Sequence, residues 1–352
     1  MRRALAAAGL ALVLVGCASG ERVAPAERSE RTDARSEARA GAVAEPGVSL
    51  LSAVLSADPW TYEGARGQVV RTRHYRIFTT ETDALLAGRL PGFLELALEH
   101  YRTAITPLPA PDLRLDAYLM DNRPQWARLT QRLLGERAAP FLRIQRGGFA
   151  TRGIGVYYDL GAFDTLAIAA HEGWHQYTQR TFRNGLPTWL EEGVASYMEG
   201  HRWAGSTPVF LPWANLERYD QLRAAAAGVR RLPPLSAFVG SLGAVGQAEE
   251  AGLDFYAQAW LVTHFLASER REGLARLLGD AAEGRLQRIV GAAARERASI
   301  TGAGEMQRVL FETYFGDFEE AEAEYERFLA AVVAPGGRGD IAAGRPPAAL
   351  SR

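Results

Sequence analysis

The sequence predicts an α+β fold in which a small lobe with a mixed β-sheet lies over two central helices and a mainly helical lobe follows. Two observations support this fold class. Segments with strand-like alternation come before the central helices, whereas the chain after Gly200 carries mainly helical patterns. The 352 residues are 47% hydrophobic, so they can supply one substantial core.

Three strands are expected in the small lobe. Residues 69–80 are rich in β-branched and aromatic residues in partial alternation, and residues 154–160 form a shorter run of the same kind. Between them, residues 113–120 place four apolar side chains on one face: Leu113, Leu115, Ala117 and Leu119.

Helices are expected between and after these strands. Residues 83–105 have an inward-facing leucine pattern, with Pro91 interrupting the helix near its start. A helix over residues 165–182 can be capped by Asp164, and Pro187 can open a second helix a few residues later. Residues 255–268 and 318–333 are the clearest helical segments of the second lobe.

The start of the chain predicts export. A positive leader and a short apolar run end in Leu14-Val15-Gly16-Cys17, which resembles a bacterial lipoprotein box. We therefore expect residues 1–16 to be a signal peptide, Cys17 to be lipidated, and residues 17–46 to form a disordered tether. This implies an anchor in the bacterial cell envelope, at the outer membrane or the periplasmic face. No other cysteine remains for a disulfide.

The other end of the chain predicts a second loose segment. Residues 334–352 are rich in Gly, Pro and Ala, so we expect a disordered tail and a single folded domain over residues 47–333. The net charge of −1, from 40 basic and 41 acidic residues, argues against nucleic acid as a partner. Because the chain contains no lysine, Schiff-base chemistry is also excluded.

One short motif indicates chemistry. On the helix expected over residues 165–182, His171 and His175 are four residues apart and so share a face, where two imidazoles can bind one metal ion. Glu172 lies on a neighbouring sector, from which it can take a proton from metal-bound water. A catalytic zinc site needs a third protein ligand, and Glu191 and Glu192 on the next helix are the candidates.

These motifs resemble those of the gluzincin metallopeptidases. In that group His-Glu-x-x-His is followed by Trp-Leu-x-Glu-Gly on a second helix, and the fragment here reads Trp189-Leu190-Glu191-Glu192-Gly193. The spacing is most similar to that of the bacterial peptidase-MA-like proteins. The resemblance implies a zincin-like fold and a Zn²⁺ ion held by His171, His175 and Glu192, with Glu172 as the catalytic base and Glu191 as the fallback ligand.

The resemblance is less specific further along the chain, and two features depart from it. Tyr256 and His264 are similar to positions that stabilise the oxyanion in this group, although core packing explains both equally well. Ser196 stands where thermolysin-like members have an aspartate that orients a histidine ligand. The chain also lacks the Gly-x-Met-Glu-Asn segment of aminopeptidases, which favours an endopeptidase.

Two functions are compatible with these motifs. The first is a lipid-anchored zinc metallopeptidase that hydrolyses peptide or protein substrates with a metal-activated water. The alternative is a non-hydrolytic, zinc-containing surface or peptide-binding lipoprotein, in which the metal is structural. We also expect residues 154–160 to pair with an extended substrate as an added strand. The remaining histidines, among them His74, His100 and His201, are expected to be structural or exposed.

Overall fold

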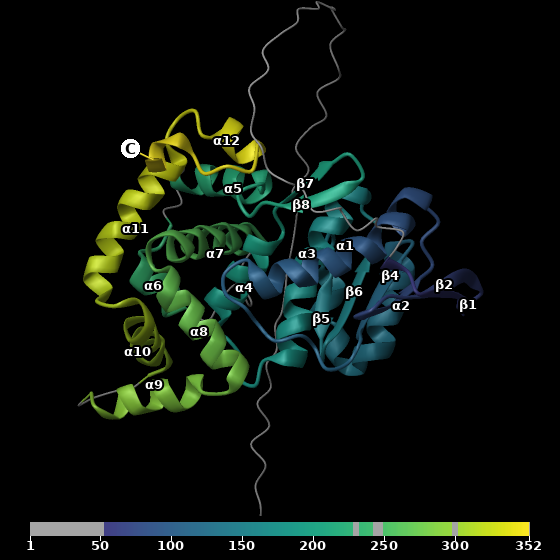
Figure 1. Ribbon diagram of the computed structural model, residues 1–352, viewed down its shortest axis with the longest axis horizontal. Coiled ribbons are helices and arrows are strands. Elements are labelled where there is room, and N and C mark those ends of the chain that lie inside the picture. Colours follow the sequence, from purple (N-terminus) through teal and green to yellow (C-terminus); the bar gives the residue numbers. More distant parts are fainter. Residues whose placement is uncertain (1–52, 228–231, 242–248, 298–301, 352) are drawn as a thin grey trace, which may run out of the picture.

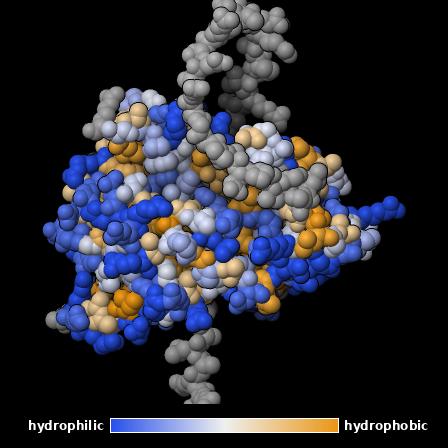
Figure 2. Space-filling model, in the orientation of Figure 1, coloured by the Kyte–Doolittle hydropathy of each residue, from blue (hydrophilic) through white to orange (hydrophobic). Residues whose placement is uncertain are grey.

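The computed structural model describes residues 53–227, 232–241, 249–297 and 302–351 and has a mixed α+β architecture (Figure 1). The expected signal peptide, Cys17 and tether lie outside these residues. Among the described helices, none is long and apolar enough to cross a membrane. On the face shown in Figure 2, hydrophobic side chains form small groups among hydrophilic ones.

A six-stranded sheet forms the first lobe. Its strands are β1 (Ser56–Tyr62), β2 (Ala65–Arg71), β3 (Tyr75–Thr79), β4 (Leu115–Met120), β5 (Phe149–Thr151) and β6 (Ile154–Tyr158). They are arranged in the order β1-β2-β3-β4-β6-β5. The three central strands β3, β4 and β6 are parallel, and the outer strands pair antiparallel, so the sheet is mixed as predicted.

Helices cover both faces of this sheet. One face packs on α1 (Ala84–Thr103) and α3 (Ala162–Thr181), whose buried side chains belong to the main core of the molecule. The other face packs on α2 (Arg123–Leu134), where Trp126, Phe149 and Tyr158 lie in a second, smaller core. Two 3-10 turns, Gly135–Ala138 and Phe141–Arg143, lead from α2 to β5.

The second lobe is mainly helical. It begins with α4 (Thr188–Met198) and a hairpin of β7 (His201–Ala204) and β8 (Thr207–Phe210). The helices that follow are α5 (Leu216–Ala227), α6 (Leu235–Val239), α7 (Glu249–Glu269), α8 (Arg271–Glu283), α9 (Leu286–Arg295), α10 (Ala303–Phe315), α11 (Phe318–Val333) and α12 (Arg338–Ala342). A 3-10 turn at Ala348–Ser351 ends the described chain.

The main core contains buried residues of both lobes, and within the second lobe α4 packs closely against α7. A Cβ atom added to Gly193 of α4 would lie 2.6 Å from the carbonyl oxygen of Ala259 in α7, so only glycine fits there. Trp189 of α4 and Trp260 of α7 are both buried in the main core. This packing fixes α4, and hence its glutamates, relative to the rest of the core.

Several expected elements differ in the structure. The strand predicted over residues 69–80 is two strands, because Thr72 N donates to the Tyr75 carbonyl and closes a turn between β2 and β3. Leu113 lies before β4 and is largely exposed. The helix predicted over residues 83–105 is continuous through Pro91, which is buried.

The prediction that residues 154–160 add a substrate strand is wrong. β6 pairs with β4 along its whole length on one side, and its residues 154–156 pair with β5 on the other, so β6 is an inner strand of the sheet and not a free edge. The edge strand on this side of the sheet is β5, which has three residues and is too short to show a periodic pattern in the sequence.

The C-terminal segment is also more ordered than its composition predicts. Instead of a disordered tail from residue 334, the structure has α12 and the final 3-10 turn. Arg338 makes a two-pronged ion pair with Asp220 of α5, and Ile341 is fully buried in the main core. The buried Ile341 side chain and the ion pair are among the contacts that attach the segment to the core and to α5.

Candidate metal centre

Helix α3 carries the two histidines and is firmly attached to the sheet. Its N-cap is Gly161 rather than Asp164, which lies in the first turn and forms an ion pair with Arg146 (2.5 Å). Gln176 donates to the carbonyl oxygens of Asp116 and Gly153, and Ala170 accepts from the hydroxyl of Tyr101. These contacts hold α3 from two sides, so the position of its inner face is fixed.

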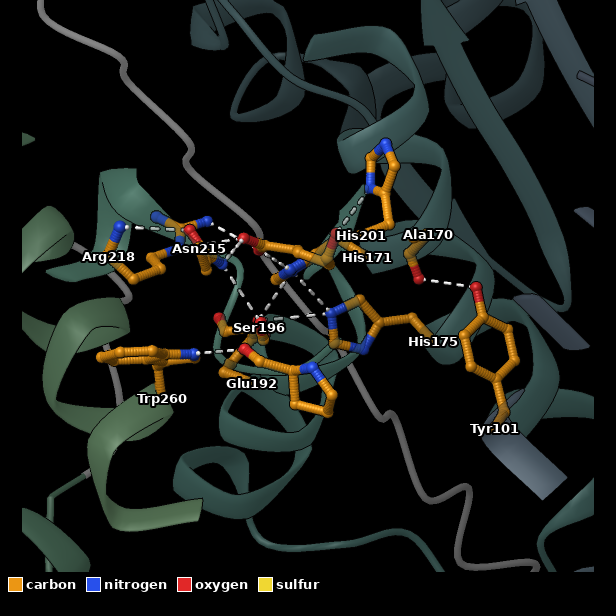
Figure 3. Close-up of polar contacts among 12 residues, drawn as sticks. Tyr101, Ala170, His171, His175, Glu192, Ser196, His201, Asn215, Arg218 and Trp260 are labelled. Atoms are coloured by element: carbon orange, nitrogen blue, oxygen red, sulfur yellow. Dashed lines mark hydrogen bonds and ion pairs between the residues drawn. The ribbon is translucent and has the colours of Figure 1, made fainter. Parts of the chain in front are cut away.

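His171, His175 and Glu192 converge in the interior. They form a group that could hold a metal ion, and each is 3% exposed or less. Nε2 of His171 lies 3.2 Å from Nε2 of His175, and Oε2 of Glu192 lies 3.3 Å and 3.2 Å from these two atoms (Figure 3). The structure therefore brings together the three residues that the spacing and the resemblance pointed to.

The three donor atoms fit a tetrahedral zinc site. Donors that are 2.0–2.1 Å from a tetrahedral zinc ion are about 3.3 Å apart, which matches all three separations. The carboxylate oxygen Oε2 of Glu192 makes no well-formed hydrogen bond with any described residue although it is buried. A buried anionic oxygen facing two imidazole nitrogens in this way is suited to a shared cation.

The other ring nitrogen of each histidine faces a second carboxylate. Nδ1 of His171 is 2.6 Å from Oε1 of Glu199, and Nδ1 of His175 is 3.0 Å from Oε1 of Glu191. A carboxylate accepts the Nδ1 proton and so leaves the Nε2 lone pair of each neutral ring directed at the other ring and at Glu192. Two facing lone pairs would repel each other unless a cation lies between them.

The glutamates thus divide into one candidate ligand and two orienting partners. Glu191, the fallback ligand expected from the sequence, does not face Nε2 of either histidine; it holds His175 and also accepts from the hydroxyl of Thr178 (2.7 Å). Ser196 is buried but makes no side-chain hydrogen bond within the described residues. Glu199, one turn further along, orients His171 instead.

Glu199 is itself held by two residues from the start of α5. Nδ2 of Asn215 donates to Oε2 of Glu199 (2.6 Å), and Arg218 donates to both carboxylate oxygens (2.8 and 3.3 Å). Burial alone would raise the pKa of Glu199, but the charge of Arg218 and the hydrogen bond with His171 outweigh it and hold the pKa at about 2. The carboxylate is therefore ionised at neutral pH.

The electrostatics of the candidate ligands follow the same pattern. Burial would raise the pKa of Glu192, but the charge of His175 and the close contacts of its carboxylate with both histidines lower it to about 2. Burial would lower the pKa of His175, yet the charges and hydrogen bonds of Glu192 and Glu191 raise it well above its usual value. Despite its burial, the pKa of His171 is raised as well, by its contacts with Glu192 and Glu199. Because a metal ion binds neutral imidazole, metal binding and proton release are coupled at these two histidines.

Glu172 behaves differently from the other glutamates. It is fully buried, and neither of its oxygens has a hydrogen-bond partner among the described residues. Burial raises its pKa to about 7, because the neighbouring histidines offset only part of the desolvation. A carboxyl group with a pKa near neutrality is suited to both accepting and donating a proton.

Gly148, just before β5, makes room for Glu172. A Cβ atom at this position would lie 2.9 Å from the carbonyl oxygen of Val156 and 3.1 Å from Cγ of Glu172. The backbone of the edge strand therefore passes directly beside the Glu172 side chain.

The structure separates the two candidate oxyanion residues. Tyr256 lies close to the centre, with its ring centroid 6.1 Å from that of His171 and the guanidinium of Arg218 over its face. His264 is instead stacked on Trp213, with ring centroids 3.7 Å apart, and its Nε2 faces the Pro212 carbonyl at 3.3 Å. Burial lowers the pKa of His264 to about 3, as expected for a core histidine.

A cavity of about 370 Å³ opens beside the cluster. His171 and Glu172 line it, together with Glu199, Asn215 and Arg218. His201, which the sequence placed among structural or exposed histidines, is buried and also lines this cavity.

Fold and site together define a mixed α+β protein with a buried His-His-Glu cluster that could bind a metal ion. Residues 165–285 match a family described as "Protein of unknown function (DUF1570)". This stretch includes both candidate ligand helices, Glu199 and the start of α5. No curated protein matches the chain.

Sequence reasoning missed Glu199, Asn215 and Arg218. Glu199 falls seven residues after Glu192, not at the four-residue spacing of the thermolysin-like pattern. Arg218 and Asn215 come from a segment beyond the β7–β8 hairpin, and no local pattern could have related them to His171.

Proposed function

We propose that the chain is a lipid-anchored zinc metallopeptidase of the gluzincin type, with a zincin-like fold, that hydrolyses peptide bonds. The observation that supports this most is the set of 3.2–3.3 Å separations between Nε2 of His171, Nε2 of His175 and Oε2 of Glu192, next to the unpartnered Glu172. A purely structural zinc site has four protein ligands and no use for a buried free carboxylate.

The residues divide the chemistry between them. His171, His175 and Glu192 would hold the ion, which when bound lowers the pKa of water and polarises the substrate carbonyl. Glu191 and Glu199 fix the two imidazoles by accepting their Nδ1 protons. Glu172 takes a proton from the attacking water on a carboxylate oxygen and delivers it to the nitrogen of the leaving amine.

Tyr256 is the better of the two oxyanion candidates. Its ring lies beside that of His171, and a tyrosine hydroxyl next to the metal centre would stabilise the negative charge that develops on a substrate carbonyl oxygen. His264 is given no role in the reaction, because its ring is enclosed by Trp213, Trp260 and Tyr197.

The proposal of a lipid anchor is supported by the sequence that precedes Ala18. Export to the cell envelope suits a peptidase whose single cysteine is used for lipidation and whose fold needs no disulfide. Globomycin treatment of expressing cells tests this point, since a lipoprotein precursor would accumulate with its signal peptide uncleaved.

The central experiment compares wild type with Glu172→Gln. The amide has the same shape but cannot take up a proton, so both proteins should bind one zinc ion per chain while cleavage of casein falls by about 10² to 10⁴-fold in the variant. Zinc is measured by elemental analysis of protein purified without chelator. Equal zinc content with no cleavage by either protein across a peptide library would support the non-hydrolytic alternative instead.

A further inference from the structure

The cavity beside the candidate metal centre is open to a small ligand. Its volume of about 370 Å³ falls within the range of small-molecule sites in proteins. Both His171 and Glu172 line the cavity, so an occupant would lie next to a candidate metal ligand and next to the proposed catalytic base.

Most of the accessible surface of the cavity wall is apolar. Leu160, Ile168, Trp203 and Ile341 come from four separate parts of the chain and meet there.

The charged lining residues largely balance one another. Arg146 is paired with Asp164 (2.5 Å), and Arg218 is paired with Glu199 (2.8 Å). Arg202 and Glu217 also line the cavity and have opposite signs. With its charges balanced in this way, the cavity has no positive excess to select an acidic side chain. Its one additional acid is the functional Glu172.

One wall comes from the C-terminal helix α12. Ile341 is fully buried, and both Ile341 and Ala342 line the cavity. The helix is held by the Arg338–Asp220 ion pair and by the close approach of Gly337 to Tyr219, where a Cβ atom would lie 3.0 Å from the tyrosine hydroxyl. Its attachment to α5 therefore fixes where this wall stands (Figure 1).

We propose that this cavity receives a bulky apolar side chain of the peptide substrate, adjacent to the bond that is cleaved, and that Ile341 determines the size of side chain accepted. The inference rests on the proposed peptidase function and specifies its substrate class. Apolar walls reward burial of Leu or Phe through the hydrophobic effect. A Gly residue has no side chain to bury in the cavity, so it gains no such stabilisation.

The test uses the zinc-loaded full chain and a cleaved parent peptide in which the residues flanking the scissile bond are varied among Gly, Ala, Leu, Phe and Trp. At one flanking position, wild type should prefer Leu or Phe to Gly by at least about tenfold in kcat/KM. Ile341→Ala should shift the preference toward Trp by about tenfold. Ala342→Phe, which fills the cavity, should shift it toward Ala by a similar factor.

Leu350→Ala is the matched control. Leu350 belongs to the same C-terminal segment and packs on the same core, but it does not line the cavity. Its selectivity should stay within about twofold of wild type, since it removes packing without changing the wall. The proposal is overturned if wild type shows no preference for apolar side chains, or if Ile341→Ala and Ala342→Phe alter selectivity no more than Leu350→Ala does.

A separate readout distinguishes this proposal from the peptidase function. If zinc-loaded wild type cleaves no peptide, the proposed function fails, and binding of N-acetyl-L-phenylalaninamide and N-acetylglycinamide is then compared by NMR titration. Tighter binding of the phenylalanine probe, weakened by Ala342→Phe but not by Leu350→Ala, supports an apolar side-chain pocket without catalysis. Equal binding of the two probes overturns the pocket as well.

Discussion

Nδ1 of His171 lies 2.6 Å from Oε1 of Glu199, and Glu199 is in turn held by Arg218 at 2.8 Å. This buried chain connects the HExxH helix α3 to the start of α5 in the second lobe. The orientation of a candidate metal ligand thus depends on residues that are distant in the sequence. Replacing Glu199 or Arg218 should therefore lower the affinity for a metal ion as well as the stability of the fold.

Glu199→Gln should weaken zinc binding by about 10 to 100-fold, because the amide is a poorer acceptor for the His171 Nδ1 proton. The dissociation constant is measured by competition with a chromophoric chelator. The variant also leaves Arg218 without its charge partner, so thermal unfolding is recorded alongside.

A matched pair elsewhere in the chain controls for this change. His74 and Glu95 form a similar histidine–carboxylate contact, with Nδ1 2.7 Å from Oε2. This contact joins the turn between β2 and β3 to α1. Glu95→Gln should leave zinc affinity unchanged. If both variants lose affinity equally, Glu199 has no specific role in orienting the ligand.

Glu191→Ala and Glu192→Ala should differ sharply, although the two residues are adjacent. Glu192→Ala removes the third candidate ligand and should abolish stoichiometric zinc, whereas Glu191→Ala removes only the partner of His175 Nδ1 and should cost about 10 to 100-fold in affinity. Elemental analysis after dialysis separates the two outcomes. Full zinc retention by Glu192→Ala would contradict the assignment of Glu192 as a ligand.

Gly193→Ala should destabilise the protein by about 1 to 3 kcal/mol, because its Cβ atom would meet the Ala259 carbonyl at 2.6 Å and push α4 away from α7. Gly279 of α8 is the control, since a Cβ atom there meets nothing within 4 Å. Gly279→Ala should instead stabilise the helix by about 0.5 to 1 kcal/mol. Chemical denaturation measures both, and a neutral Gly193→Ala would show that α4 and α7 are not tightly fixed.

The buried His264 should make stability depend on pH. Burial lowers its pKa to about 3, below the usual 6.5 of an unfolded chain, so between these values the unfolded state binds more protons. The free energy of unfolding should therefore fall as the pH falls through this window. The loss due to this residue is about 2 kcal/mol by pH 5. His264→Phe should flatten the slope, and an unchanged slope would argue against a buried neutral ring.

Local patterns in the sequence predicted the centre of the site well. The four-residue spacing of His171 and His175 places both on one helical face whatever the tertiary structure, and the Trp189–Gly193 fragment identified Glu192 over Glu191. The α+β class and the exact span of α11, residues 318–333, also followed from periodicity. These are properties of contiguous segments, which sequence patterns report directly.

Features made by distant segments could not be predicted in this way. Strand β1 contains Pro59 and several polar residues, so it becomes a strand only by pairing with β2. Arg218 reaches Glu199 through packing of α5 against the core. The C-terminal segment has only two large apolar residues, Ile341 and Leu350, yet both pack on the main core, which composition could not reveal.

The depth of the His171-His175-Glu192 cluster has a practical consequence for handling the protein. Because these residues are at most 3% exposed, a chelator can reach an ion held among them only through the adjoining cavity or after local opening of the fold. The rate at which a bound metal ion exchanges should then be limited by access through the cavity or by local opening of the fold. If the centre binds a metal ion, its removal by EDTA should be slow, and preparation of the apoprotein then calls for long incubation or mild denaturant.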